Sequence, residues 1–286
     1  MFEGFREIAF DSGPARIHGR VGGSGPPILL LHGHPRTHAT WHMVAADLVR
    51  DYTVVCPDLR GYGRSSKPVT TPDHAPYAKR AMARDMVGLM RSIGFDQWTQ
   101  VGHDRGAYVS FRLAMDEPDC VSRLVILDAV PIGDALDQCG AAFATAWWHW
   151  FFYGQTAKPA ERIINADPGA WYAVSPDRMG REAFLDLQAA LHNPDTVHAM
   201  LEDYRAGLGI DRQHDREDRK TGRRLQCPML FVRAEHDDLG DLYDDPAGIW
   251  RSWSDEVTES CLPCGHHMAE EAPDALAALI RAFVRQ

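Results

Sequence analysis

Short apolar runs bounded by turn-forming residues recur along the chain, at residues 28–31, 53–56, 99–101, 124–127, 229–232 and 257–262. Their length and boundaries are typical of buried strands. Longer stretches between them, such as 78–93 and 107–116, show helical patterning. This alternation predicts an α/β fold with a mostly parallel sheet and helices on both faces.

The alternation stops after residue 130 and resumes at Cys227-Pro228, which leaves an insert too long for an ordinary crossover. The insert is rich in aromatic residues and its pattern is helical. We therefore predict a core at 1–130, a helical cap at 131–224 after the sixth strand, and the rest of the core at 225–286. Most of the aromatic residues are expected to pack the cap onto the core, and ligand pockets favour such seams.

Composition narrows the classes of partner. A chain of 286 residues with 45% hydrophobic content can bury a large core, and a net charge of −10 disfavours nucleic-acid partners. The N-terminal segment MFEGFREIAF carries charges where a signal peptide needs an apolar stretch, and no segment is apolar enough to span a membrane. We expect a soluble, cytoplasmic protein without a membrane partner.

The six cysteines are scattered, and only Cys261 and Cys264 lie close together in the sequence. A zinc site or a redox pair would need a second pair at ligand spacing. We expect buried or half-buried free thiols, no metal and no cofactor.

Candidate chemistry begins with Gly102-His103-Asp104-Arg105-Gly106, which lies between a predicted strand and a predicted helix. This arrangement matches the nucleophile elbow G-x-S-x-G, with aspartate at the serine position. The glycines are needed because side chains beside this strained turn would collide with the strand and the helix. An aspartate capping a helix would explain Asp104 alone, so the surrounding motifs decide the interpretation.

Two further motifs supply that context. The loop containing His34, in His32-Gly33-His34-Pro35, directly follows strand 28–31, where one oxyanion-hole N–H is expected. The second N–H would come from Arg105, the residue after the nucleophile. Gly265-His266 follows the last strand and completes the order nucleophile, acid, histidine. His267 is adjacent, and His266 is preferred because it directly follows the glycine.

An aspartate nucleophile predicts attack on a saturated carbon. A serine alkoxide would form an ether there, whereas the carboxylate of Asp104 forms an ester that water can hydrolyse. Water would attack the carbonyl carbon of Asp104 with His266 as general base, while the two N–H groups stabilise the oxyanion.

The acid that orients His266 has two candidates. Asp128 ends strand 124–127, and Asp237 follows strand 229–232. The pattern leaves the choice open, because either residue could instead be a turn residue or a helix cap.

Over nearly its whole length the chain resembles the fluoroacetate dehalogenase branch of the α/β-hydrolases, close to the epoxide hydrolases. The matching segments are Gly102–Gly106, Leu127-Asp128, Trp148-His149-Trp150, Asp203-Tyr204-Arg205-Ala206-Gly207 and Pro263-Cys264-Gly265-His266. The resemblance implies Asp104 as nucleophile, with Asp128 and His266 completing the triad. It also implies that His149, Trp150 and Tyr204 hold the leaving halide, as their N–H and O–H groups can donate to a small anion.

One position departs from the family pattern. The resemblance implies two arginines that bind the substrate carboxylate, one directly after the nucleophile and one three residues further. The first is Arg105, but the second position is Tyr108. Arg36, on the predicted oxyanion loop, is a candidate replacement, and an exposed loop arginine is the alternative.

The leading hypothesis is a hydrolytic dehalogenase that converts a 2-haloacetate-like acid to the 2-hydroxy acid. An epoxide hydrolase would use the same Asp104 and His266, and the loss of one carboxylate-binding arginine suits an uncharged epoxide. A non-catalytic ligand-binding protein of this fold is disfavoured, because it would need no nucleophile, acid and base together. The expected partner is a small-molecule substrate, and a homodimer is an oligomeric state that the sequence allows.

Overall fold

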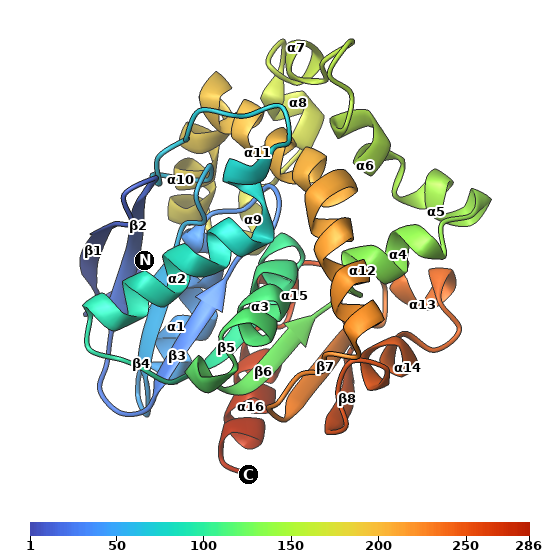
Figure 1. Cartoon of the computed structure of the whole chain (residues 1–286). Helices are drawn as coiled ribbons and strands as arrows, with labels where there is room; N and C mark the ends of the chain where they lie inside the picture. The colour runs from blue at the N-terminus through green and yellow to red at the C-terminus, as the bar shows by residue number, and fades with distance from the viewer.

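The computed structural model describes residues 1–286, and an eight-stranded sheet forms its centre (Figure 1), in the order β1-β2-β4-β3-β5-β6-β7-β8. Six strands run parallel: β3 (Pro27–Leu31), β4 (Thr53–Pro57), β5 (Trp98–His103), β6 (Val121–Leu127), β7 (Met229–Ala234) and β8 (Val257–Leu262). Each contains or coincides with one of the predicted apolar runs. The predicted α/β fold is confirmed.

An N-terminal hairpin was not predicted from the sequence. Strands β1 (Arg6–Asp11) and β2 (Arg16–Gly22) pair antiparallel, and β2 pairs antiparallel with β4. Ile8 is the only buried residue of β1. An edge strand with one solvated face has no continuous apolar run, so its signal is weak.

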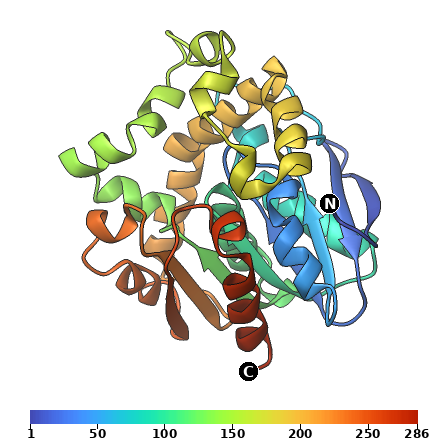
Figure 2. The ribbon, with the colours of Figure 1, turned by 180° about the vertical axis from the view of Figure 1, so that it is seen from behind.

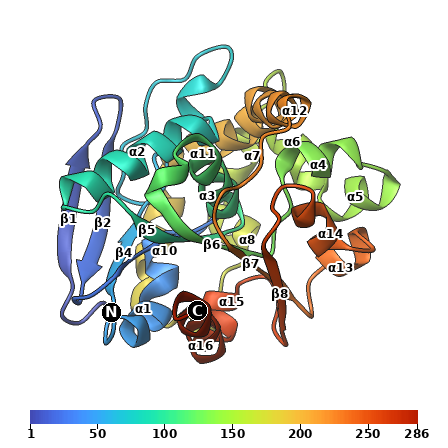
Figure 3. The ribbon, with the colours of Figure 1, turned by 60° about the horizontal axis from the view of Figure 1, so that its bottom comes forward.

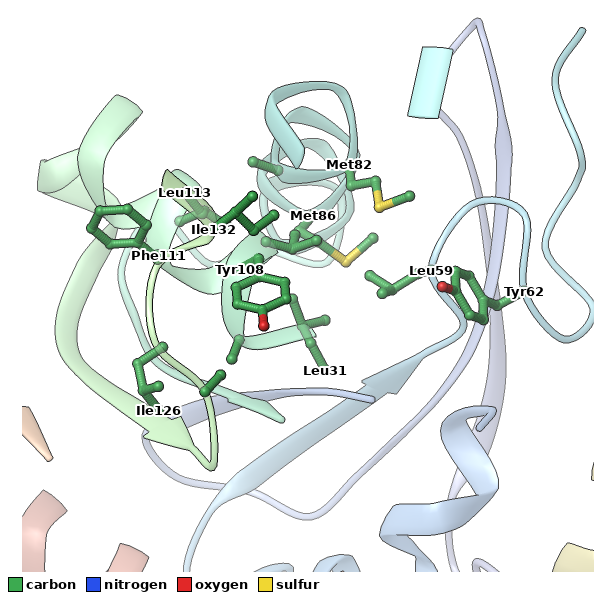
Figure 4. Packing of buried hydrophobic residues seen from close by; sticks show 14 of the residues in the cluster. Leu31, Leu59, Tyr62, Met82, Met86, Tyr108, Phe111, Leu113, Ile126 and Ile132 are labelled. Carbon is green, nitrogen blue, oxygen red and sulfur yellow. The ribbon is translucent and has the colours of Figure 1, made fainter. Parts of the chain in front are cut away.

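Helices cover both faces of the sheet, as predicted. Helices α2 (Lys79–Ser92) and α3 (Arg105–Asp116) lie on one face, and α1 (His42–Leu48) and α16 (Pro273–Val284) lie side by side on the other (Figures 2 and 3). Successive strand residues point to opposite faces. Leu29 and Leu31 accordingly join the core under α2 and α3, while Ile28 and Leu30 join the core under α1 and α16. Figure 4 shows the first of these cores.

A run of helices connects β6 to β7 and lies above the sheet in Figure 1. It contains α4 (Ile132–Asp137), α5 (Ala141–Ala146), α6 (Trp148–Tyr153), α7 (Glu161–Ile164), α8 (Pro168–Tyr172), α9 (Pro176–Met179), α10 (Arg181–Leu191), α11 (Pro194–Ala206), a π-helical turn (Gly207–Asp211) and α12 (Arg212–Thr221). We call these helices the cap. All of them fall within the segment 131–224.

The remaining helices are short: α13 (Leu239–Leu242), α14 (Pro246–Arg251), α15 (Met268–Glu271) and the 3₁₀ turns His38–Trp41, Ala75–Tyr77 and Pro118–Cys120. No helix combines the length and apolar character needed to cross a bilayer. All six cysteines are free thiols, but Cys139 and Cys261 are exposed, so the expectation of buried or half-buried thiols is wrong for these two.

Candidate active site

Asp104 lies in a sharp turn between β5 and α3, with φ 50° and ψ −118°. Residues other than glycine rarely adopt a positive φ. A Cβ atom at Gly102 would lie 2.3 Å from the carbonyl oxygen of Gly106, and a Cβ atom at Gly106 would lie 2.4 Å from that of Leu31. The two glycines therefore allow strand, turn and helix to pack closely enough to present the Asp104 carboxylate.

Two groups from other loops meet this carboxylate. The backbone N–H of His34, in the loop after β3, donates to Asp104 Oδ1 at 2.6 Å. Nε2 of His266, in the loop after β8, lies 3.8 Å from Asp104 Oδ2. Arg105 is the first residue of α3, so its backbone N–H has no acceptor within the helix. The structure thus brings the candidate nucleophile, base and oxyanion donors together.

Both candidate acids contact the same atom of His266. Asp128 Oδ2 lies 2.8 Å from Nδ1, and Asp237 Oδ2 lies 2.9 Å from it. Neighbouring parallel strands explain the convergence: Leu127 of β6 is in register with Val232 of β7, so both aspartates follow the same edge of the sheet. Asp128 is buried and its Oδ1 accepts the backbone N–H of Ala234 at 2.8 Å, whereas Asp237 is partly exposed.

Electrostatics favour an ion pair in the resting site. Burial opposes charge on His266, but the contacts with Asp104, Asp128 and Asp237 outweigh it and raise the pKa of His266 well above its usual value. Burial likewise opposes ionisation of Asp104, but the contact with His266 lowers the pKa of Asp104 far below its usual value. The candidate nucleophile is therefore ionised at neutral pH, as attack on carbon requires.

A cavity of about 250 Å³ opens at these residues, between the sheet and the cap. Its lining consists of His34, Asp104, Tyr108, Asp128, Ala146, Trp147, His149, Trp150, Tyr204, Asp237, Asp238, His266 and His267. The lining contains four carboxylates and no lysine or arginine. Sequence reasoning assigned no role to Trp147 or Asp238, which hydrogen bond to each other at 2.8 Å. His267 lines the cavity too, but His266 makes the contacts expected of the base.

The three predicted leaving-group residues all line this cavity. His149 and Trp150 come from α6 and Tyr204 from α11. Burial lowers the pKa of His149 to about 4, so its ring is neutral at pH 7 and carries one N–H. Burial also raises the pKa of Tyr204 well above its usual value, which keeps its hydroxyl protonated. All three side chains can therefore act as neutral hydrogen-bond donors.

Arg105 lies behind the cavity wall rather than among the lining residues. Its guanidinium group donates to the Asp203 carboxylate through Nε and Nη2, both at 3.1 Å, and stacks 4.1 Å from the centre of the Tyr204 ring. Nη1 is buried and has no partner. Asp203 also accepts from Tyr62 and Lys79. Apart from its place in a family segment, nothing near Asp203 in the sequence indicates that it accepts from Arg105, Tyr62 and Lys79.

The structure contradicts both interpretations of Arg36, as a replacement carboxylate-binding arginine and as an exposed loop arginine. It is buried, so it is not an exposed loop residue, and it does not line the cavity. Its Nε and Nη2 atoms donate to the two carboxylate oxygens of Glu270 at 2.8 and 3.0 Å. Because Nε and Nη2 donate to Glu270 and the side chain lies outside the cavity lining, the structure does not support Arg36 as a replacement for the second carboxylate-binding arginine.

Other candidate sites are less suited to chemistry. A larger hollow of about 760 Å³ is lined by Arg60, Asp85 and the segment around Pro72, but Arg60 and Asp85 pair with each other. His18 and His38 could form a ligand group with Asp58. The Asp58 carboxylate is already occupied by both imidazoles and two backbone N–H groups, which indicates a structural role.

Fold and site together define the class. The family model for the alpha/beta hydrolase fold matches residues 26–273. The chain therefore belongs to the alpha/beta hydrolase family, and it is a hydrolase.

Its relatives narrow the class. A fluoroacetate dehalogenase from Burkholderia sp. is 40% identical over 292 residues, which cover 99% of this chain and 95% of the relative. A soluble epoxide hydrolase from Corynebacterium sp. (strain C12) is 32% identical over 272 residues, 90% of each chain. A solved structure from Nostoc sp. PCC 7120, assigned to the alpha/beta hydrolases, is 39% identical with a TM-score of 0.94 and covers 99% of each chain. The resemblance predicted from the sequence is confirmed.

Proposed function

We propose that this hydrolase displaces a leaving group from a saturated carbon through an ester on Asp104, and that its substrate is a 2-haloacetate-like acid. The observation that carries the proposal is the contact set of Asp104. Its ionised carboxylate lies at the cavity, with His266 Nε2 at 3.8 Å and the His34 N–H at 2.6 Å. The similarity to a fluoroacetate dehalogenase supports the choice of substrate.

In the first step an Asp104 oxygen attacks the carbon that bears the halogen. The carbon–halogen bond breaks, and the halide leaves with the bonding electron pair. His149, Trp150 and Tyr204 would donate hydrogen bonds to the departing halide, since all three line the cavity together with Asp104. The product of this step is the aspartyl ester.

In the second step water attacks the carbonyl carbon of Asp104 while His266 Nε2 accepts a proton from it. Esterification removes the negative charge of Asp104, which is one of the contacts that raise the pKa of His266, so this pKa falls and the ring can release its proton to solvent before it acts as the base. The N–H groups of His34 and Arg105 would stabilise the oxyanion. Collapse breaks the ester bond, the released alkoxide takes the proton from His266, and the restored Asp104 carboxyl loses a proton to solvent.

Three observations favour an epoxide as the second candidate substrate. Tyr108 replaces the second expected arginine, and no lysine or arginine lines the cavity. A soluble epoxide hydrolase is also among the relatives. Tyr204 or His149 would then protonate the epoxide oxygen as the ring opens on Asp104.

The test uses His266→Asn, which should permit the first step and block the second. Incubation with chloroacetate or fluoroacetate should add a carboxymethyl group to Asp104, and incubation with an epoxide should add the whole mass of the epoxide, as measured on the intact protein. A single turnover of the unchanged enzyme in H₂¹⁸O should label Asp104 and leave the first product unlabelled. Label in that product would mean direct hydrolysis and would refute the ester mechanism.

A further inference from the structure

Two carboxylates, those of Asp128 and Asp237, contact the same ring nitrogen of His266, although one carboxylate is enough to orient an imidazole. Nδ1 of His266 carries at most one hydrogen, and Asp128 and Asp237 both lie within hydrogen-bond distance of it. One carboxylate oxygen from each aspartate and one ring nitrogen of His266 all lie within 4.8 Å of one another. Two ionised carboxylates at this separation repel each other, and binding one proton between them relieves the repulsion.

The surroundings of the two aspartates differ. The Asp128 side chain has no exposed surface, whereas 27% of the Asp237 side chain is exposed at the cavity. A charge is more stable on the better-hydrated carboxylate, and a proton is more stable on the buried one. Burial raises the pKa of Asp128, while the contacts of Asp237 with His266 and Asp128 outweigh its burial and lower its pKa.

We propose that Asp128 and Asp237 act as a pair that shares one proton and carries one negative charge, and that either carboxylate alone can position His266. The inference rests on the proposed function, because it assigns both residues to the step in which His266 accepts a proton. In the intact pair the remaining negative charge stabilises the imidazolium formed as water attacks. Loss of one carboxylate leaves the other with the same charge, because the remaining carboxyl releases the shared proton.

Other titratable groups surround the pair. Burial lowers the pKa of His103 to about 3 and that of His267 well below its usual value, so both rings stay neutral near pH 7. The groups that face the pair or His266 are Asp104, Asp238, His103, His149, His267 and Cys264. None of them hydrogen bonds to Nδ1, so none can substitute for the pair in orienting the ring.

The experiment compares Asp128→Asn, Asp237→Asn and the double variant in rapid-mixing assays that separate ester formation from ester hydrolysis. Asparagine suits position 128 because it tolerates the positive φ of 50° found there. Each single variant should hydrolyse the ester within about tenfold of the unchanged enzyme, whereas the double variant should lose about 10³-fold or more and accumulate ester on Asp104. Asp244→Asn, at an exposed position further along the chain, controls for the change in net charge.

The pH profile separates a shared proton from two independent acids. Hydrolysis needs neutral His266, so its rate rises with pH through the pKa of that ring. With a shared proton each single variant keeps one negative charge beside the ring, and the midpoint should move by less than about half a pH unit. Two independently ionised aspartates would lose one of two charges, and the midpoint should fall by about one unit or more. That fall would overturn the shared proton.

A spectroscopic readout does not depend on turnover. The low-field proton resonance of His266 Nδ1–H should persist in both single variants and disappear in the double variant. Loss of the resonance and of hydrolysis in one single variant, with the other unaffected, would overturn the pair and leave one acid. If no variant forms an ester with any substrate, the proposed function fails, while the resonance still tests the pair.

Discussion

Tyr108 is buried at the cavity wall, where its ring lies 5.2 Å from the Arg105 guanidinium group. No lysine or arginine lines the cavity, and most donors of Arg105, behind the cavity wall, already serve Asp203. A haloacetate would gain little charge-assisted binding in this arrangement. The identity of residue 108 thus bears directly on whether acids or neutral molecules are preferred.

Tyr108→Arg should raise kcat/KM for chloroacetate by about tenfold to a hundredfold, through a second charge-assisted contact. The gain should be absent for 2-chloroacetamide, which has the same leaving group and a similar shape but no charge. Tyr108→Phe, which keeps the ring, is the matched control. If the arginine variant loses activity on both substrates, Tyr108 serves packing rather than selectivity.

The proposed role of His149 and Trp150 in binding the leaving halide can be tested with substrates that differ in the carbon–halogen bond that breaks. His149→Ala and Trp150→Phe should reduce turnover of fluoroacetate more than that of chloroacetate, because fluoride is the poorer leaving group and depends more on donated hydrogen bonds. Steady-state release of halide measures both rates. Equal losses on the two substrates would indicate that these side chains only pack the cavity.

At the scale of elements, a buried ion cluster joins the cap to the core. Asp203 of α11 accepts from Lys79 of α2, Arg105 of α3 and Tyr62, and Lys79 also contacts Asp211 at 3.1 Å. These contacts hold α11, and with it Tyr204, against the helices beside the candidate nucleophile. The cluster therefore links cap placement to the shape of the cavity.

Asp203→Asn should lower the free energy of unfolding by about 3–5 kcal/mol, because it leaves two buried cations with too little compensating charge. Urea denaturation at pH 7 measures the change. Asp137→Asn is the control, since Asp137 pairs with Arg212 and Arg216 at the surface, where such pairs contribute about 1 kcal/mol or less. A similar loss in both variants would contradict the role of burial.

Elements with strong local patterns could be predicted, and those without could not. Strands β3 to β7 are largely buried on both faces and read as apolar runs, whereas the edge strand β8 is mostly exposed. Helices α2 and α3 begin and end within two residues of the predicted ranges. Strands β1 and β2 were not predicted, because an edge hairpin exposes alternate residues and so has no continuous apolar run. Asp104, Asp128, Asp237 and His266 could be named because each follows a strand end, where parallel strands bring their loops together.

Contacts between distant segments left no such signal. The partner of Arg36 is Glu270, 234 residues away, and nothing near either residue in the sequence indicates the pairing. The pairing of Arg105 with Asp203 likewise has no local signal in the sequence. Without knowledge of that pairing, Arg105 is interpreted as free to bind substrate. That both acids contact His266 was also beyond the sequence, since it depends on the register between β6 and β7.

For the whole molecule, acid should weaken the attachment of the cap. Burial opposes ionisation of Asp203, but Arg105 and Lys79 outweigh it and lower the pKa of Asp203 to about 2, from 3.8. A depressed pKa stabilises the folded state above the unfolded value, and this stabilisation is lost as pH falls toward the folded value. Glu161, which contacts His198 and Arg205, has a pKa lowered to about 2 despite partial burial and acts in the same direction.

The difference in unfolding free energy between the unchanged protein and Asp203→Asn should therefore be largest above pH 5. It should narrow by about 2 kcal/mol as pH falls toward 2, because a protonated Asp203 resembles the amide. Urea denaturation at several pH values measures this difference. A constant difference across the range would show that the charge of Asp203 does not stabilise the contact between the cap and the core.

The Arg36–Glu270 ion pair connects the two loops that meet at Asp104. Arg36 lies two residues after His34, Glu270 lies four residues after His266, and Thr40 donates to the same carboxylate at 2.7 Å. The segment that carries the proposed oxyanion donor and the segment that carries the proposed base are thereby linked by buried hydrogen bonds. Little reorganisation energy would then be required as charge develops on Asp104, so the site would be preorganised for the second step of the proposed reaction. An arginine that contacts no substrate would in this way still contribute to the rate.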